Sequence, residues 1–167
     1  MELIDNFLEE SDLIALQSYC LGSDCLWSYM PVVTHKDGSK DQYQFVHGFY
    51  RNGAPDYHQD MNVVYPILNK ISPTSIFRIK MNLLTRKPFT ENTFHQDMFG
   101  LSDEKMKQWT TSIFYVNTNN GYTEFKDGTK VESVANRIIS FPSNTMHRGT
   151  SCTDQDSRII INFNYFK

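Results

Sequence analysis

Residues 109–134 read WTTSIFYVNTNNGYTEFKDGTKVESV, and this stretch indicates a fold built from β-strands. Trp109 to Asn117 is rich in the β-branched and aromatic residues that strands favour, and Asn120-Gly121 is typical of a type I′ hairpin turn. Tyr122 to Phe125 would then pair back on the first strand, Asp127-Gly128 would turn again, and Lys130 to Val134 would follow. We therefore expect three short strands joined by tight turns.

The β pattern continues on both sides of this stretch. Ile76 to Leu84 alternates, so Phe77, Ile79, Met81 and Leu83 should face one way, and Arg78, Lys80, Asn82 and Leu84 the other. Further strands are expected at Arg137 to Phe141, around His147 and at Arg158 to Phe166. Roughly seven to nine strands with turn signals at short intervals are typical of a sandwich or barrel rather than of βαβ units.

The first part of the chain predicts a mixed α/β region. Leu3 to Leu8 is expected to be extended, and Ser11 is a plausible N-cap of a helix that reaches Cys20 and ends at Gly22. Trp27 to Thr34 and Tyr43 to Tyr50 flank a hairpin signal at Lys36 to Lys40, and Asp60 to Ile71 has a helical pattern. This region has no obvious active group, so it is interpreted as support for the sheet.

Composition limits the class of protein. The length of 167 residues fits one domain, and the net charge of −3 without a Lys/Arg block makes a nucleic-acid partner unlikely. Cys20, Cys25 and Cys152 lack metal-type pairing. A Cys20–Cys25 disulfide is conceivable, but free thiols in a reducing cytosol are favoured. No signal sequence or membrane-length apolar run is present, so we expect a cytoplasmic protein without a membrane partner.

Three side chains form a candidate metal site. His95 and Asp97 are two residues apart, so on an extended backbone both point to one face, and His147 would come from a distant strand. Two imidazoles and one carboxylate are the facial triad that holds non-heme Fe(II). The alternatives are a hydrogen-bonded polar pair for His95 and Asp97 and a loop histidine for His147. A second His-Gln-Asp, at residues 58–60, is interpreted as a helix entry, and His35 and His47 as surface or packing residues.

Several segments together resemble a known family. They are Phe94 to Asp97, Thr111 to Asn117, Asn120 to Phe125, Arg137 to Pro142 running into His147, and Arg158 to Phe166, with a looser likeness at Leu3 to Leu8. The chain is similar here to the Fe(II)/2-oxoglutarate-dependent dioxygenases, in their prolyl-4-hydroxylase-like branch. The resemblance implies a mainly β fold, a double-stranded β-helix (a cupin-like jelly roll) with supporting N-terminal helices. It implies one dioxygenase domain, 1–167, with a support region at 1–74 and the catalytic core at 75–167.

The resemblance also assigns roles to single residues. His95, Asp97 and His147 would bind the metal and carry catalysis, and Arg158 would anchor the far carboxylate of 2-oxoglutarate unless it forms a surface salt bridge with Asp154 or Asp156. Tyr115 would join Arg158, although it could equally be a core aromatic residue, with Ile113 beside it in the pocket. Asn82 would contact the co-substrate near the metal. Leu84 stands where some relatives have tyrosine, and Asn162 and Asn164 would face the substrate side.

The implied activity is that of an oxygenase. With Fe(II), O2 and 2-oxoglutarate as co-substrate, the protein would hydroxylate an unidentified substrate, a peptide side chain such as proline or a small molecule, and release succinate and CO2. The alternatives are a non-catalytic cupin-like metal-binding protein and a structural jelly roll. The loop Met98 to Gln108, with one possible helical turn at Ser102 to Lys107, is expected to border the substrate entrance.

Overall fold

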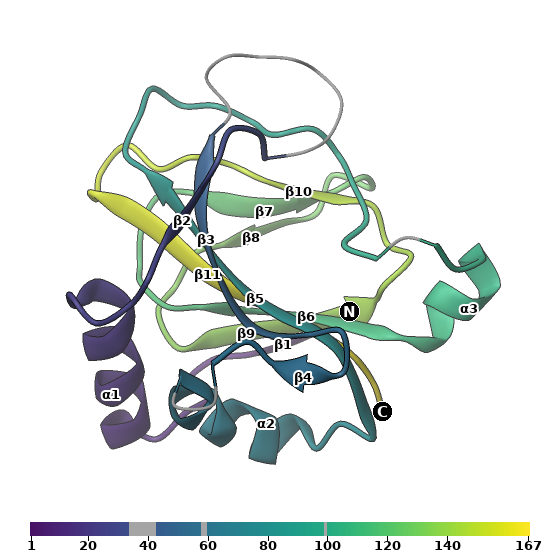
Figure 1. Ribbon diagram of the computed structural model, residues 1–167. Coiled ribbons are helices and arrows are strands. Elements are labelled where there is room, and N and C mark those ends of the chain that lie inside the picture. The colour runs from purple at the N-terminus through teal and green to yellow at the C-terminus, as the bar shows by residue number, and fades with distance from the viewer. Residues whose placement is uncertain (34–42, 58–59, 99) are drawn as a thin grey trace.

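Two facing antiparallel sheets form the protein. Its computed structural model, shown in Figure 1, describes residues 1–33, 43–57, 60–98 and 100–167. The eight-stranded sheet has the order β1 (Glu2–Ile4), β9 (Arg137–Pro142), β6 (Thr110–Tyr115), β11 (Ser157–Phe166), β5 (Ser75–Thr85), β3 (Gln44–Arg51) and β2 (Ser28–Met30), with β4 (Ala54–Pro55) paired to β3. The three-stranded sheet has the order β10 (His147–Gly149), β7 (Tyr122–Phe125) and β8 (Lys130–Glu132).

The chain passes repeatedly between the two sheets. From β6 in the large sheet it crosses to β7 and β8 in the small sheet, returns to β9, crosses again to β10 and returns to β11. This is the path of a double-stranded β-helix, and the predicted fold class is confirmed. Strands β1 and β3 come from the region 1–74, and they pair with β9 and β5 in the same large sheet.

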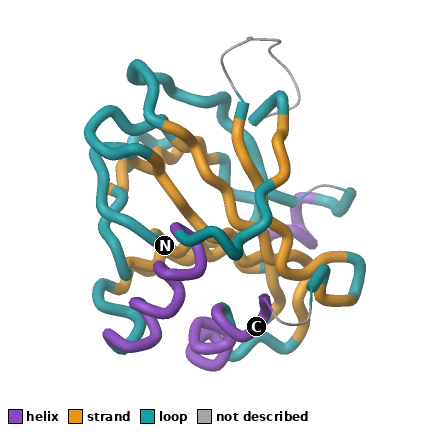
Figure 2. The backbone as a smooth tube through the Cα atoms, turned by 60° about the vertical axis from the view of Figure 1, so that its left-hand side comes forward, coloured by secondary structure: helices purple, strands orange, loops and turns teal. Residues whose placement is uncertain are grey.

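Helices cover the outer face of the large sheet. They are α1 (Glu10–Leu21), the 3₁₀ helix η1 (Asp60–Val63) and α2 (Tyr65–Ile71), while α3 (Asp103–Gln108) lies apart from them (Figures 1 and 2). Leu16 of α1 and Ile67 of α2 are buried in one cluster with Ile79, Met81 and Ile161 of the sheet. The helices therefore support the sheet on the side away from the small sheet, as the amphipathic patterns predicted.

The space between the two sheets holds a second, smaller core. Its members, from strands of both sheets, are Ile113, Tyr115, Phe125, Val131, Ile139, Phe141 and Ile160. Strand β5 separates the two environments: Ile79 and Met81 enter the outer core, whereas Lys80, Asn82 and Leu84 line a cavity between the sheets. The alternation predicted for this strand is confirmed at these positions.

The predicted hairpin at Asn120-Gly121 is wrong. Residues of β7 pair with β8 and β10 instead of folding back on β6, so the segment before Tyr122 is a crossover between sheets. Gly121 serves close packing here, because a Cβ atom at this position would lie 2.7 Å from Cδ of Arg158. The Asp127-Gly128 turn is confirmed: Gly128 has a φ of 88° and joins β7 to β8.

Several boundaries in the first part of the chain differ from the prediction. Helix α1 begins at Glu10 with Glu9 as its N-cap, so Ser11 lies inside the first turn, and Gly22 ends the helix as predicted. Strand β1 stops at Ile4, because the chain turns at Asn6 with a φ of 52°. The predicted helix 60–71 is split into η1 and α2, with proline in the first turn of α2.

Other predictions for this region have mixed outcomes. The three cysteines are buried free thiols, so the free-thiol alternative is confirmed. His47 is buried, with Nδ1 2.8 Å from the Leu26 carbonyl oxygen and Nε2 3.4 Å from Asp60, and this confirms its packing role. The hairpin at 36–40, His35 and His58 fall outside the described residues. Across the described ranges, no helix is long and apolar enough to cross a membrane.

Candidate metal centre and cavity

An antiparallel bridge brings the two candidate histidines together. The backbone N–H of His95 donates to the carbonyl of His147 at 2.9 Å, and the reverse bond is 3.0 Å long, so their rings lie 4.9 Å apart. Asp97 follows two residues later, with its carboxylate oxygens 3.8 Å from His95 Nε2 and 3.7 Å from His147 Nε2. One ligand atom from each residue lies within 4.8 Å of the others. Residues distant in sequence thus form one compact donor group.

Backbone carbonyls fix the tautomers of both histidines. His95 Nδ1 lies 3.0 Å from the Thr93 carbonyl oxygen, and His147 Nδ1 lies 3.0 Å from that of Thr145. Because a carbonyl only accepts hydrogen bonds, each Nδ1 carries the proton and each Nε2 keeps a free lone pair. Burial lowers the pKa of His95, which favours the neutral, ligating form. Two neutral imidazoles and a carboxylate fit a divalent metal such as Fe(II).

Two residues of the large sheet donate hydrogen bonds to Asp97 and hold it in position. Asn162 Nδ2 lies 3.2 Å from Asp97 Oδ2, and Arg78 donates to the Asp97 carbonyl oxygen at 2.9 Å. Burial by itself raises the pKa of Asp97. At the low pH where a carboxylate titrates, both histidines are protonated, and their charges together with that of Arg78 outweigh burial, so the pKa lies below the ordinary 3.8. Asp97 is therefore a carboxylate ligand held in place before any metal binds.

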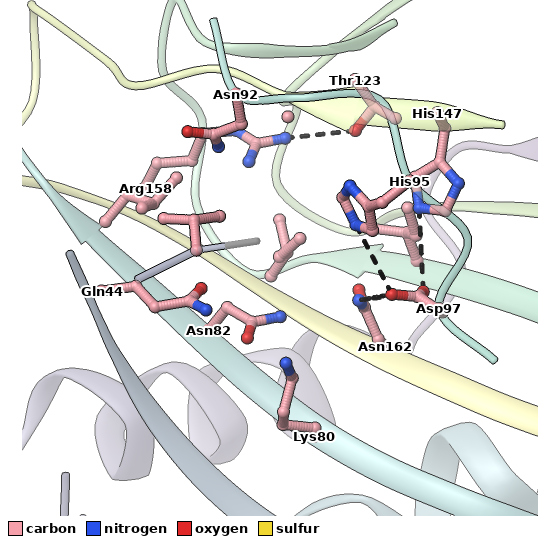
Figure 3. Close-up of a pocket in the computed structure, with 15 residues that line it drawn as sticks. Gln44, Lys80, Asn82, Asn92, His95, Asp97, Thr123, His147, Arg158 and Asn162 are labelled. Carbon is pink, nitrogen blue, oxygen red and sulfur yellow. Dashed lines mark hydrogen bonds and ion pairs between the residues drawn. The ribbon is translucent and has the colours of Figure 1, made fainter. Parts of the chain in front are cut away.

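A cavity of about 50 Å³ extends from these ligands toward Arg158 (Figure 3). Its side chains are mostly polar and include Gln44, Lys80, Asn82, Asn92, Thr123 and Asn162. The Oδ1 atoms of Asn82, Asn92 and Asn162 are buried and have no hydrogen-bond partner among the residues that the structure describes. Because buried polar atoms normally have a partner, these orphaned oxygens indicate that a polar occupant completes the cavity.

Arg158 lies at the end of the cavity opposite the metal ligands, as Figure 3 shows. Its side chain is 1% exposed, and it donates from Nε to Ser133 Oγ at 2.7 Å and from Nη2 to Thr123 Oγ1 at 3.2 Å. Neither partner is charged, and within the described part of the chain no carboxylate forms an ion pair with it. Burial lowers the pKa of Arg158, because a buried cation without a counter-ion is energetically unfavourable.

The surface salt bridge considered for Arg158 is absent from the described residues. Asp156 pairs instead with Arg86 at 3.2 Å, and Asp154 accepts the backbone N–H of Asn120 at 3.0 Å. Strand β11 buries Arg158 because it runs through the centre of the large sheet, between β5 and β6. The guanidinium is therefore directed into the cavity and away from the surface.

Tyr115 stands behind the cavity wall. Its hydroxyl donates to Thr123 Oγ1 at 2.8 Å, the same oxygen that accepts from Arg158, and its ring centroid lies 5.8 Å from the Arg158 Cζ. The residue belongs to the inner core and is not part of the cavity lining, whereas Ile113 and Thr123 are. The structure thus places Thr123 between Tyr115 and the site where an anion would meet Arg158.

The remaining expected residues divide between the cavity and its surroundings. Asn82 and Asn162 line the cavity, whereas Asn164 accepts from Arg78 and donates to Thr111. The predicted helical turn in the loop after the metal motif exists as α3, capped by the Ser102 side chain. None of the described residues of this loop lines the cavity, so its substrate role stays a prediction.

The sequence interpretation missed several cavity residues. Lys80 was placed by the sequence on the same strand face as Asn82 but was given no role, and Thr123 could have been found because it shares a strand face with Phe125. Gln44 and Asn92 carry no sequence signal, since they come from separate segments that only the fold brings together. Gly149 lies against Arg158, where a Cβ atom would be 3.2 Å from Nη1, and nothing in its local sequence indicates this.

Comparisons with known proteins give a result only at the level of structure. No family model matches the chain, and no curated protein matches it in sequence. A prolyl hydroxylase from Trichoplax adhaerens, in complex with a hypoxia-inducible-factor peptide fragment, is similar with a TM-score of 0.67 and 14% identity, covering 99% of this chain and 82% of that one.

Two further similar structures, a prolyl hydroxylase and a carbocyclase, differ from each other in activity. The viral collagen prolyl hydroxylase of Paramecium bursaria Chlorella virus-1, as its 2-oxoglutarate complex, has a TM-score of 0.60 and 17% identity, with 99% and 95% of the two chains covered. The non-heme α-ketoglutarate-dependent carbocyclase SnoK from nogalamycin biosynthesis has a TM-score of 0.65 and 12% identity, covering 99% and 78%. The chain therefore has the fold of the Fe(II)/2-oxoglutarate oxygenases, and prolyl hydroxylases are prominent among its structural neighbours.

Proposed function

We propose that this protein is an Fe(II)- and 2-oxoglutarate-dependent oxygenase that hydroxylates its substrate. The observation that carries the proposal is the pairing of an open three-ligand metal site with a buried, uncompensated arginine across one polar cavity. A dicarboxylate with one end on the metal and the other on Arg158 would satisfy both ends of this cavity. Relatives in fold use that co-substrate, which is consistent with the assignment.

His95 Nε2, His147 Nε2 and an oxygen of Asp97 would hold the iron. Three protein ligands leave coordination positions for the co-substrate and O2. Fe(II) held there would supply the activation of O2. This activation would couple the oxidative decarboxylation of 2-oxoglutarate, to succinate and CO2, to insertion of one oxygen atom into a C–H bond of the substrate. The chain itself fixes the geometry, through the carbonyls of Thr93 and Thr145 behind the histidines.

Arg158 would bind the far carboxylate of the co-substrate. A guanidinium matches a carboxylate in a two-pronged geometry, and Ser133 and Thr123 already orient it. Tyr115 would act through Thr123, whose oxygen it shares with Arg158. Asn82, whose carboxamide oxygen has no partner, would contact the end of the co-substrate near the metal.

The rival functions account for fewer of these features. A cupin-like protein that only stores a metal would use the triad but would not need a buried cation at the far end of the cavity. A structural jelly roll would need neither. The substrate is a peptide side chain such as proline or a small molecule, and the three buried free thiols suit a reducing compartment such as the cytoplasm.

Turnover with matched histidine variants tests the proposal. The protein loaded with Fe(II) under air should convert 2-oxoglutarate to succinate, even slowly and without substrate. His147→Ala should abolish succinate formation, whereas His58→Ala, in the second His-Gln-Asp, should retain it. Succinate formation that survives in His147→Ala and disappears in His58→Ala would refute the metal assignment.

A further inference from the structure

A large groove adjoins the metal cavity. It has a volume of about 710 Å³, within the ~300–1,000 Å³ typical of small-molecule sites, and it shares Val33, Gln44 and Lys80 with the cavity. Its walls carry the rings of Tyr50, Tyr57, Phe77 and Trp109 and the apolar side chains of Leu26, Met30, Val46 and Ile76. A substrate with an apolar or aromatic body would fit this groove and reach the metal past Lys80.

Lys80 lies at the junction between the metal cavity and the groove, and its side chain lines both. In Figure 3 its side chain rises from β5 and its ammonium group points toward Asn82 and Asn162, into the cavity. The pKa of Lys80 lies below its ordinary value, because burial and the neighbouring Arg78 lower it more than Asp97 raises it. None of the described residues forms a hydrogen bond or an ion pair with its ammonium group. Lys80 is half-buried and lines both the cavity and the groove, so its ammonium group is accessible to an anionic ligand in either space.

The other cations of the groove already have partners. Arg78 donates to Asn164 Oδ1 at 3.1 Å and to the carbonyl of Asp97 at 2.9 Å, and its Nη2 lies 3.7 Å from the carboxylate oxygen Oδ1 of Asp97. Arg51 donates to Asp56 at 2.8 Å. Lys80 is therefore the cation at this junction, among the described residues, whose charged group has neither a hydrogen-bond acceptor nor an ion-pair partner.

The co-substrate does not compensate this charge. Among the described side chains lining the metal cavity, the charged groups are Arg158, Lys80 and Asp97, and both histidines are neutral when they bind a metal. Asp97 and the two carboxylates of 2-oxoglutarate together neutralise a divalent metal and Arg158. Among the described side chains that line the cavity, Lys80 then keeps its positive charge without a counter-ion, on the side that opens into the groove. Arg78 lies outside this sum, because it lines the groove and not the cavity.

We propose that Lys80 binds an anionic group, a carboxylate or a phosphate, of the primary substrate, and that this substrate is a small acid with an apolar body lying in the groove. The proposal rests on the proposed function, and it narrows the substrate from a peptide side chain or a small molecule to a small acid. Lys80 would hold the anion beside the metal, so that a C–H bond close to the acid group faces the reacting centre.

Matched acidic and neutral probes test this inference. Protein loaded with Mn(II) and saturating 2-oxoglutarate is titrated by calorimetry with 3-phenylpropanoate, its neutral amide 3-phenylpropanamide, and phenyl phosphate. The better anion should bind about tenfold more tightly than the amide, as expected for one hydrogen bond to a charged group. Lys80→Met should abolish this preference, and Lys126→Met, an exposed control on the turn after β7, should keep it. The tighter of the two anions distinguishes a carboxylic acid from a phosphate ester.

Three results would overturn the inference. The first is equal binding of the anions and the amide, which includes no binding of any probe. The second is a preference for the anions that persists in Lys80→Met. The third is a loss of 2-oxoglutarate affinity of more than about threefold in Lys80→Met, which would assign Lys80 to the co-substrate. Binding of 2-oxoglutarate to the Mn(II) protein is measured first. If it is absent, the proposed function fails and this inference fails with it; if it is present, only the role of Lys80 is at stake.

Discussion

Replacement of Arg158 by glutamine tests whether this arginine binds the co-substrate or only stabilises the fold. The native guanidinium is 1% exposed, has two hydroxyl partners and lacks a carboxylate partner among the described residues. Removing one side of a buried charge pair costs about 2–5 kcal/mol, so the dissociation constant of 2-oxoglutarate should rise about 30-fold or more. The assay is calorimetric titration of 2-oxoglutarate into the Mn(II)-loaded protein.

The same variant should fold almost as well as the native protein. Loss of two hydrogen bonds is offset by removal of an unpaired buried cation, so the free energy of unfolding should change by no more than about 1 kcal/mol. Arg86→Gln is the matched control, since Arg86 is an exposed arginine paired with Asp156. An Arg158→Gln protein that is folded and binds 2-oxoglutarate within about threefold of the native affinity would refute the reasoning.

Two further predictions follow from the structure. Gly121→Ala would place a Cβ atom 2.7 Å from Arg158 Cδ and 3.0 Å from the Ser151 carbonyl oxygen. The arginine should therefore be displaced, and the variant should bind 2-oxoglutarate about tenfold more weakly in the same titration. Unchanged affinity would show that the position of the arginine is not critical. Deletion of Ser102 to Lys107, which removes most of α3, should preserve decarboxylation of 2-oxoglutarate without substrate and abolish hydroxylation of the true substrate. Full retention of both activities would exclude a substrate role for the loop.

The strand pattern of the second half of the chain was predictable because period-two alternation is imposed by the two environments of each strand. Lys80, Asn82 and Leu84 face the cavity while Ile79 and Met81 face the helices. The common direction of His95 and Asp97 was predictable for the same reason, since they are two residues apart, whereas His147 joins them only through the fold. The alternation and this common direction depend on local sequence.

What the sequence could not provide depends on contacts between distant segments. The dipeptide Asn120-Gly121 has the composition of a hairpin turn, but its glycine is required by the close approach of Arg158 from a different strand. In the same way, Ser133 and Thr123 meet Arg158 only after the chain has crossed between the sheets. Turn composition alone cannot distinguish a hairpin from a crossover.

Two boundary errors in residues 1–74 have one local cause and one tertiary cause. The helix predicted from Ser11 starts at Glu10, because Leu13 donates its N–H to the Glu9 carbonyl and this closes the first turn earlier. The expected strand beyond Ile4 is interrupted because Leu8 donates its backbone N–H to Asn136 Oδ1 at 2.7 Å, which draws this segment into the core. The first effect is a local helix hydrogen bond, whereas the second is a tertiary contact that overrides local propensity.

A crystal structure of the protein with Mn(II) and 2-oxoglutarate tests the central claim most directly. We expect the metal on His95 Nε2, His147 Nε2 and Asp97, with one end of 2-oxoglutarate on the metal and the far carboxylate within hydrogen-bond distance of the Arg158 guanidinium. A metal elsewhere, or 2-oxoglutarate bound away from Arg158, would contradict the account.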